Sequence, residues 1–349
     1  MAKGSHTWTE ILNQPRSWRA TLEALAAQRP ALERFLGRVE FDQILVVGCG
    51  STHYLAQSAA ATLTHCTGVP ARAFPSSELW LFPDVVRAER SLLLAISRSG
   101  TTTETLRAVE RFRQVSNGPV MVITCHGQSP LAQQADLALV AAEAQEQSVA
   151  QTRSFTSMLL LSEALAAILA GDPAMLERLQ RLPAALDGLV SRMGDLPRRL
   201  GVEQEITNIF YLGGGPLYGL ANEAMLKTKE MSLSHTEAYH ALEFRHGPMS
   251  MVNPQTLVVG LLSDRCLAEE VRVLEDVKRL GARTLALVED EARLAGWTAD
   301  HVVELCSGLG EWERGPLYLP PVQHLAYHRA MAKGLDPDRP INLRAVVEL

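Results

Sequence analysis

The chain has 349 residues and a net charge of −6, and 47% of its residues are hydrophobic, as expected for a soluble protein with a buried core. Lys and Arg are dispersed, which argues against a nucleic-acid-binding surface. Without a long apolar run or a signal-peptide start, the sequence predicts a cytoplasmic protein that does not contact a membrane. The five cysteines form no C-x-x-C pair, so we expect reduced thiols rather than disulfides or a zinc site.

The first half of the chain alternates between apolar runs and helical patterns. Residues 7–37 are predicted to be helical, with a break between two helices at Pro30. The apolar run at 44–47 precedes a glycine turn and an Ala-rich segment, which is typical of a buried parallel strand followed by a helix. Further strands are predicted at 91–96, 119–125 and 137–142, and a long apolar helix at 151–169. This alternation indicates an α/β fold with a doubly wound parallel sheet.

The second half repeats that pattern. A strand, a glycine turn and an Ala-rich helix return within 206–227, and strands are predicted at 256–262, 284–288 and 301–305. A helical connection at 170–203 separates the two halves, and a final helix is expected from about Pro320 to Met331. We therefore predict two tandem, flavodoxin-like domains. The expected segments are an N-terminal helical segment (1–35), a first, phosphate-binding domain (36–185) and a second domain with a C-terminal tail (200–349).

Two turns of the first half could hold a ligand. Gly48-Cys49-Gly50 follows a strand, as in dinucleotide-binding folds, but His53 stands at the third glycine position, which disfavours a nicotinamide cofactor. The turn 97–103 gathers several hydroxyls and main-chain N–H groups at the start of a helix. That arrangement favours a phosphate monoester, and the alternative is an ordinary helix cap. In the second half Asp264 follows the matching strand, where the phosphate would lie, so we expect only one phosphate site.

The stretch from Glu223 to Pro248 is dense in ionisable residues. On a helix, Glu223, Lys227 and Glu230 share one face at i, i+4 and i+7. The spacing alone fits either a catalytic group or a solvated face with an ordinary ion pair. The stretch ends in Arg245-His246-Gly247-Pro248, which is a turn pattern.

Three motifs together, GCGST, ISRSGTTTET and KTKEMSLSHTEAYHALEFRHGP, resemble the double sugar-isomerase (SIS) domain family, as does the opening EILNQPRSW. The family includes the isomerase half of glucosamine-6-phosphate synthase and the type II glucosamine-6-phosphate deaminases. The resemblance covers nearly the whole chain. The glutaminase domain of the synthase has no counterpart in this sequence, so glutamine-dependent synthesis is not expected.

The resemblance implies roles for individual residues. Glu230 would be the proton-transfer carboxylate, with Glu223 and Lys227 as supporting groups beside it. His246 would open the sugar ring and would come from the neighbouring subunit of a homodimer. Phosphate contacts would fall on Ser97, Arg98, Ser99 and Thr102, and sugar contacts on Cys49, Gly50, Ser51, Thr52, Val149 and Gln151, the last replacing a serine of the synthase.

The tail departs from the synthase pattern, in which a lysine forms a Schiff base with the ketose. Arg344 stands near the corresponding place, and an arginine stays protonated and cannot act as that nucleophile. An amino-sugar substrate carries its own nitrogen. The expected reaction is therefore hydrolytic isomerisation of glucosamine 6-phosphate to fructose 6-phosphate and ammonia, without metal or organic cofactor.

Other functions remain open on the sequence. They are cleavage of fructosamine phosphates by an SIS-type deglycase, synthase-like interconversion of aldose and ketose phosphates, and non-catalytic sensing of a sugar phosphate. The sensor is disfavoured because Glu230 and His246 are retained and no basic helix-turn-helix segment is present. N-acetylglucosamine 6-phosphate, galactosamine 6-phosphate and an Amadori phosphate are alternative substrates.

Overall fold

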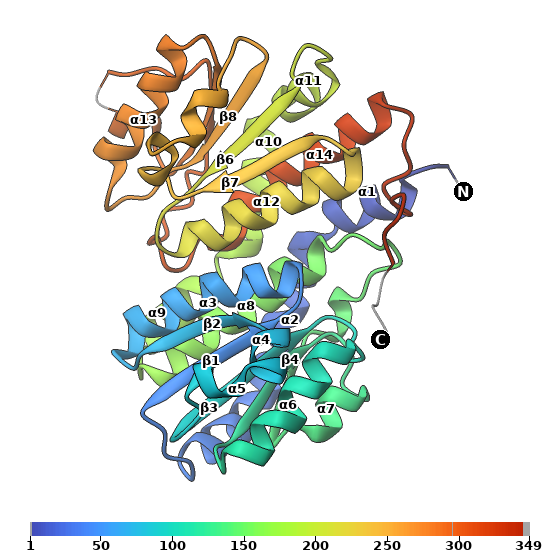
Figure 1. The fold of residues 1–349 in the computed structure, drawn as a ribbon, viewed down its shortest axis with the longest axis vertical. Helices are drawn as coiled ribbons and strands as arrows, with labels where there is room; N and C mark the ends of the chain where they lie inside the picture. The colour runs from blue at the N-terminus through green and yellow to red at the C-terminus, as the bar shows by residue number, and fades with distance from the viewer. Residues whose placement is uncertain (1, 295, 345–349) are drawn as a thin grey trace. The chain divides into compact units, whose positions relative to one another are not determined.

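The computed structural model describes residues 2–294 and 296–344, which form two compact units (Figure 1). The first unit contains Asn13–Glu146, Gln151–Pro183 and Arg344. The second contains residues 2–12, Gln147–Ala150 and Ala184–Leu343. Each unit is built on a five-stranded parallel sheet, which confirms the prediction of two tandem doubly wound α/β domains.

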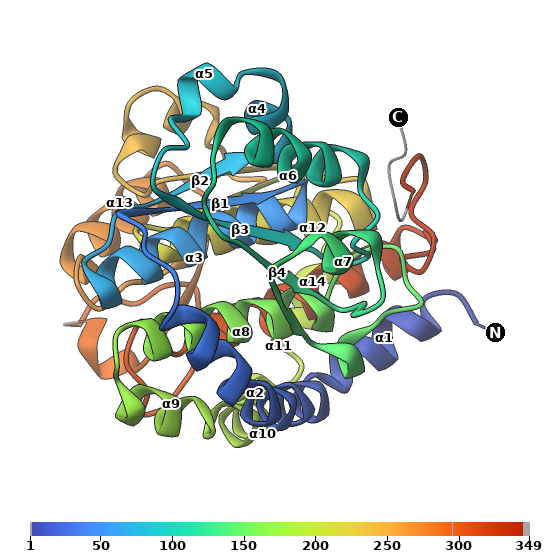
Figure 2. The same ribbon diagram turned by 90° about the horizontal axis from the view of Figure 1, so that it is seen from below.

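The first sheet has the strand order β2-β1-β3-β4-β5. Its strands are β1 (Gln43–Gly48), β2 (Ala71–Pro75), β3 (Ser91–Ser97), β4 (Val120–Thr124) and β5 (Leu137–Val140). The helices are α2 (Gln14–Leu36), α3 (Ser51–Thr67), α4 (Ser76–Leu81), α5 (Pro83–Val86), α6 (Thr103–Val115), α7 (Pro130–Gln134), α8 (Arg153–Leu169) and α9 (Pro173–Leu179), with the short η1 (Ala142–Ala144). Figure 2 shows β1 and β3 between α3 and α8 on one face and α4 and α6 on the other. Helices on both faces explain the continuous apolar strands.

The second sheet has the order β10-β9-β8-β6-β7. Its strands are β6 (Asn208–Leu212), β7 (His235–Tyr239), β8 (Thr256–Leu261), β9 (Arg283–Val288) and β10 (His301–Glu304). The helices are α1 (Ser5–Leu12), α10 (Leu182–Met193), α11 (Leu196–Val202), α12 (Pro216–Ser232), α13 (Leu267–Arg279) and α14 (Leu319–Ala332). Short turns complete it: η2 (Glu243–Arg245), η3 (Pro248–Met251), η4 (Glu291–Leu294) and η5 (Gly315–Tyr318). α14 packs against α11 and α12, and α13 against β8 and β9.

The two sheets are copies of one design with nearly constant spacing. Each strand of the first unit starts 163 to 165 positions before its counterpart, and so do the two helices α3 and α6, as with Ser51 of α3 and Pro216 of α12, or Thr103 of α6 and Leu267 of α13. The glycines before α3 and α12 adopt the same backbone conformation, with φ 55° and ψ −124° at Gly50 and φ 55° and ψ −127° at Gly215. A side chain rarely tolerates this conformation, so both turns require glycine. The internal repeat is thus visible in the backbone.

The structure corrects two details of the predicted elements. The helix break lies at Asn13, and Pro30 sits inside α2. Leu25 and Leu32 are buried on either side of the proline, and this packing outweighs the roughly 3 kcal/mol that an interior proline costs. The sheet edges formed by β2 and β7 were not predicted, because their residues are partly exposed and their sequences lack a continuous apolar run.

Candidate functional site

The glycine turn after β1 is held by Thr52 in the first turn of α3. The Thr52 hydroxyl accepts a hydrogen bond from the Cys49 main-chain N–H (2.9 Å) and donates to the Cys49 carbonyl (3.0 Å). Ser51 and Thr52 are buried. The Cys49 Sγ lies 3.5 Å from the Thr105 hydroxyl, and burial raises the pKa of the Cys49 thiol. The four predicted sugar-contact positions 49–52 are therefore adjacent in one turn, with Cys49 as a protonated thiol rather than a thiolate nucleophile.

The loop between β3 and α6 carries the predicted phosphate contacts. The Ser97 hydroxyl accepts a hydrogen bond from the Gly100 N–H (3.1 Å) and lies 3.5 Å from the Thr102 hydroxyl. The Ser99 hydroxyl accepts bonds from the main chain (3.2 Å) and the hydroxyl (3.0 Å) of Thr101. Because Ser99 acts as acceptor in both bonds, its own O–H can donate to a ligand. The loop precedes a 13-residue helix, whose N-terminus favours an anion.

Gly100 fixes the shape of this loop. Its φ is 65°, in the left-handed region, and an added Cβ would lie 2.0 Å from the Ser129 hydroxyl. Neither the backbone conformation nor the space allows a side chain here. The loop is therefore held closely against Ser129, the residue that caps α7.

Arg98 is tied to a carboxylate of the same unit. Its guanidinium lies 3.4 Å from Glu146, and the exposed fractions of the two side chains are 10% and 0%. Glu146 also accepts hydrogen bonds from the Thr152 N–H (2.6 Å) and hydroxyl (2.7 Å) and from Ser154 at the start of α8. Sequence analysis assigned no role to Glu146. The structure makes it the anchor that orients Arg98 beside the phosphate loop.

The equivalent loop in the second unit is filled by the protein's own carboxylates. The Ser263 N–H donates to Glu270 (2.7 Å), and the Ser263 hydroxyl donates to Glu311 (2.6 Å). Burial is the main cause that raises the pKa of Glu270 to about 7. As predicted, acidic side chains stand here, but the one that accepts the main-chain N–H is Glu270, from the first turn of α13.

Asp264, which sequence analysis placed at the phosphate position, is instead locked into an ion-pair network. The buried Arg314 guanidinium binds both Asp264 oxygens (2.7 and 2.8 Å), and Arg293 pairs with it as well. Burial opposes ionisation of Asp264, but the hydrogen bonds and charges of Arg314 and Arg293 outweigh it and lower the pKa of this carboxyl. The charge of Asp264 is therefore compensated from within the protein.

Three ionisable side chains of α12 form a buried cluster. Glu223 and Lys227 are 0% and 1% exposed, and Glu230 keeps 15% of its side chain accessible. The Lys227 ammonium lies 2.5 Å from Glu230 and 3.5 Å from Glu223. A lysine and a glutamate are almost never fully buried unless paired. The burial rules out the solvated helix face, and the cluster leaves one partly accessible carboxylate beside an ammonium.

His246 lies on the segment that follows β7. It ends η2, is exposed, and donates its main-chain N–H to the Glu243 carbonyl (3.0 Å). Within the described residues no hydrogen bond or ion pair joins its imidazole to Glu230. The structure therefore brings Glu223, Lys227 and Glu230 together, but not His246.

The remaining predicted positions fall in three places. Val149 belongs to the second unit, and its N–H donates to the Asp338 carbonyl (3.1 Å). Gln151 belongs to the first unit, and its buried amide oxygen has no hydrogen-bond partner among the described residues. Arg344 is exposed at the last described position. The two sugar contacts, only two positions apart, thus belong to different units.

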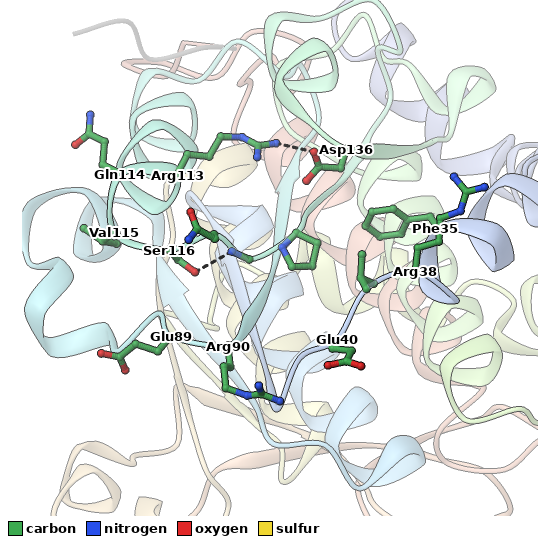
Figure 3. A pocket seen from close by; sticks show the side chains of 14 residues that line it. Phe35, Arg38, Glu40, Glu89, Arg90, Arg113, Gln114, Val115, Ser116 and Asp136 are labelled. Carbon is green, nitrogen blue, oxygen red and sulfur yellow. Dashed lines mark hydrogen bonds and ion pairs between the residues drawn. The ribbon is translucent and has the colours of Figure 1, made fainter.

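A pocket of about 910 Å³ in the first unit lies elsewhere (Figure 3). Its lining residues include Glu40, Glu89 and Pro119, which precede β1, β3 and β4, so it opens at the amino ends of these strands. Figure 3 shows the ion pair of Arg113 with Asp136 at its rim. Open parallel sheets bind ligands at the carboxyl ends of their strands. This pocket lies at the opposite end of the strands and is therefore not the expected functional site, despite its volume.

Two kinds of feature were not found in the described part of the chain. No group of three or more His, Cys, Asp or Glu side chains is arranged to hold a metal ion among residues 2–294 and 296–344. Of the helices described above, none combines the length and the apolar character needed to cross a membrane.

The sequence matches the family model described as "SIS domain" twice, over residues 40–168 and 204–331. A curated relative, the glutamine–fructose-6-phosphate aminotransferase [isomerizing] of Legionella pneumophila, is 31% identical over 306 residues. The match covers 86% of this chain and 50% of the relative. The corresponding Pseudomonas syringae protein is 28% identical, with 96% of this chain and 57% of the relative covered. The chain thus spans about half the length of the curated relatives it matches.

Solved structures match over nearly their whole length. The glucosamine-6-phosphate deaminase of Thermotoga maritima has 28% identity and a TM-score of 0.81, with 99% of this chain and 100% of that chain covered. The tagatose-6-phosphate ketose/aldose isomerase of Escherichia coli has 26% identity and a TM-score of 0.86, with 96% and 95% covered.

Proposed function

We propose that this chain, which belongs to the SIS domain family, is a sugar-phosphate isomerase acting on an amino sugar. The proposed reaction converts glucosamine 6-phosphate and water to fructose 6-phosphate and ammonia. The observation that carries the proposal is the cluster on α12, in which one partly accessible carboxylate stands beside a buried ammonium. A carboxylate held in this way can accept a proton and return it.

The loop at 97–102 is the proposed phosphate grip. The Ser99 hydroxyl, the N-terminus of α6 and the Arg98 guanidinium offer donors and positive charge to a dianion. The matching loop of the second unit engages Glu270 and Glu311 instead. A single phosphate per chain is therefore expected, bound by the first unit.

Glu230 is the proposed base for the isomerisation. In the open-chain sugar it takes the C2 proton, and the electron pair left behind forms a double bond between C2 and C1 while O1 gains a proton. Glu230 then returns its proton to C1, which leaves an imine between C2 and nitrogen. Water adds to C2 and ammonia leaves, so the product is the ketose. His246, proposed to come from a second subunit, moves the ring-hydroxyl proton when the sugar ring opens.

The tail supports an amino sugar over a substrate that requires a protein Schiff base. By the family resemblance Arg344 stands near the lysine that forms this bond in the synthase, and arginine cannot replace it. If the reaction passes through an imine, the nitrogen must then come with the substrate. The similarity to a glucosamine-6-phosphate deaminase over the full length of both chains favours the same reaction.

A second candidate is the isomerisation of a ketose phosphate that contains no nitrogen. It is favoured by the similarity to the tagatose-6-phosphate ketose/aldose isomerase, which also covers nearly all of both chains. Glu230 would transfer the same proton in that reaction. The two candidates differ in whether ammonia is released.

The test is an ammonia-release assay on glucosamine 6-phosphate, with tagatose 6-phosphate isomerisation measured in parallel. Glu230→Gln is expected to lower kcat by about 10²–10⁴-fold, the range for loss of a general base. Glu237→Gln, at an exposed carboxylate on β7, is the matched control and should keep full activity. If the wild-type protein releases no ammonia, the deaminase is rejected. If it isomerises tagatose 6-phosphate and releases no ammonia, the second candidate is selected.

The shared-site proposal has its own test, in which two inactive variants are mixed. Glu230→Gln and His246→Ala should each be inactive alone. If His246 acts in the neighbouring subunit, mixed dimers contain one intact site, and random mixing restores about a quarter of wild-type activity. Recovery of none would mean that His246 acts within its own chain or not at all.

A further inference from the structure

The loop Gln147–Ala150 belongs to the second unit, although the chain on both sides of it belongs to the first. Glu146 and Gln151 on either side belong to the first unit, while the four residues between them belong to the second. Val149, a proposed sugar contact, is in this loop and is half-buried between the buried Ser148 and Ala150. The position of Val149 therefore depends on what holds four residues that have no helix or strand of their own.

The carboxylate of Glu10, on α1, binds the start of this loop. It accepts hydrogen bonds from the N–H of Gln147 (2.6 Å) and of Ser148 (3.4 Å), and a further bond from the Ser148 hydroxyl. Glu10 is only 3% exposed. Hydrogen bonds from main-chain N–H groups to an ionised carboxylate are about twice as strong as neutral ones. One side chain thus fixes two successive peptide groups of the loop.

Asp338, near the end of the chain, binds both the loop and α1. Its carbonyl accepts the Val149 N–H (3.1 Å). Its carboxylate accepts the N–H and the hydroxyl of Thr7 (2.7 and 2.8 Å) in the first turn of α1. Asp338 is 8% exposed and Thr7 is fully buried. The helix that carries Glu10 and the main chain of Val149 are therefore held by the same residue.

We infer that Glu10 and Asp338 are positioning residues, which fix the main chain of Gln147–Ala150 and so set where Val149 meets the sugar. Neither carboxylate has an assigned part in the proton transfers. The inference rests on the proposed function and on the sugar contact of Val149 that the family resemblance implies. The first part of the inference, that Glu10 holds the loop, can be measured without any substrate.

Hydrogen exchange measured by mass spectrometry in Glu10→Gln and Glu10→Ala tests whether Glu10 holds the loop. Peptides covering 147–150 should exchange about tenfold faster or more in Glu10→Ala, and less so in Glu10→Gln, which keeps one acceptor oxygen. Peptides from β6 (Asn208–Leu212) report any general loss of stability and should not change. Glu23→Gln, at an exposed carboxylate on α2, is the control and should match wild type throughout.

Steady-state kinetics on glucosamine 6-phosphate tests the consequence. The KM should rise about fivefold or more in Glu10→Gln with kcat changed much less, as expected when binding geometry is lost rather than a proton-transfer group. Asp338→Asn should act in the same direction. The dissociation constant of glucosamine 6-phosphate, measured by calorimetry, replaces KM if the wild type binds the sugar without releasing ammonia.

The outcomes separate the two proposals. Unchanged exchange at 147–150 in Glu10→Ala would overturn the positioning role, whatever the enzyme's activity. Faster exchange with unchanged KM and dissociation constant would show that the loop does not position the sugar. Faster exchange with weaker binding supports the inference even when no ammonia is released, and in that case only the proposed reaction fails. If the wild-type protein neither binds nor converts glucosamine 6-phosphate, the claim that the loop positions this sugar is overturned. The exchange data then decide only whether Glu10 holds the loop.

Discussion

The loops after β3 and β8 occupy matching places in two copies of one fold, yet they treat negative charge in opposite ways. The loop after β3 presents hydroxyls and an arginine, and it is shaped by Gly100. In the loop after β8, the Ser263 N–H binds the Glu270 carboxylate, and Asp264 is bound by Arg314. The backbone design therefore does not decide which copy accepts an anion. Side chains at the carboxyl edge of each sheet decide it.

The helices that follow the two glycine turns, α3 and α12, also differ in charge, and here the second copy carries the ionised side chains. At the positions of α3 that match Glu223 and Lys227 of α12, 165 residues earlier, stand the buried Ser58 and Thr62. α3 thus carries small hydroxyls where α12 carries a buried ion pair. The repeat has kept one scaffold while the two copies carry different side chains, which are the proposed anion-binding hydroxyls and arginine in the first and the ionised cluster in the second.

The largest effect is expected from removing the charge that distinguishes α12 from α3. Lys227→Met would leave Glu223, which is fully buried, without its ammonium, and breaking a buried pair by removing one partner costs about 3–5 kcal/mol. The free energy of unfolding from urea denaturation should fall by that amount. Lys229→Met, at an exposed lysine of the same helix, should change it little. A loss below about 1 kcal/mol would mean that the cluster adds no more than a surface pair does.

A smaller, pH-dependent effect is expected at Glu270, which binds the Ser263 N–H in the second copy. Its pKa is about 7 in the folded protein and near 4.5 without the fold, so folding favours the protonated form. This contribution to stability is complete below about pH 4.5 and is lost as the pH rises through 7. Glu270→Gln should therefore raise the free energy of unfolding by about 1–3 kcal/mol at pH 8 and by less at pH 5.

Thermal unfolding at both pH values measures this difference. Cys266 and Glu311 also face Glu270: the hydrogen bond from Cys266 favours its ionisation, and the charge of Glu311 opposes it. Glu291→Gln, at an exposed carboxylate of η4, is the control and should show no such pH-dependent gain. Equal effects of Glu270→Gln at pH 5 and pH 8 would contradict the raised pKa.

The smallest effect is expected where the two helices end. α3 ends at Gly68 with φ 71°, whereas α12 ends at Leu233 with φ 47°, a left-handed conformation that costs a non-glycine residue about 1–2 kcal/mol. Leu233→Gly should raise the free energy of unfolding by about 1 kcal/mol, because the leucine side chain is half exposed and little burial is lost. Gly68→Leu, the reverse exchange in the other copy, should lower it by a similar amount. Equal signs for the two exchanges would refute this explanation.

How far the sequence predicted the molecule depends on the kind of residue. The interior strands, such as β3, were predicted because strands covered on both faces are continuous apolar runs. β2 and β7 were missed because they lack an apolar run, whereas the opposite edge strands β5 and β10 keep one and were predicted. Helical spacing predicted that Glu223, Lys227 and Glu230 share one face of α12. It did not predict that this face is buried, because the same spacing also occurs on solvated helix faces.

The loop anchors show a second limit of the sequence. Glu10 was visible only as one letter of a family-like opening, and Asp338 only as part of a proline-rich tail. Their partners lie more than a hundred positions away: Gln147 follows Glu10 by 137 positions, and Asp338 follows Thr7 by 331. No local pattern encodes such a pairing. The family resemblance pointed to Val149 as a proposed sugar contact, and the structure shows which residues bind its loop.

The pairing of Thr7 with Asp338 has a consequence for the order in which the protein is made. α1 is synthesised well before its partner, because the carboxylate that binds its first turn follows 331 positions later. The first sheet, complete by Val140, can fold while the rest of the chain is still being translated. The second unit cannot be completed before Asp338 is synthesised, so α1 gains this contact only after the first sheet can fold.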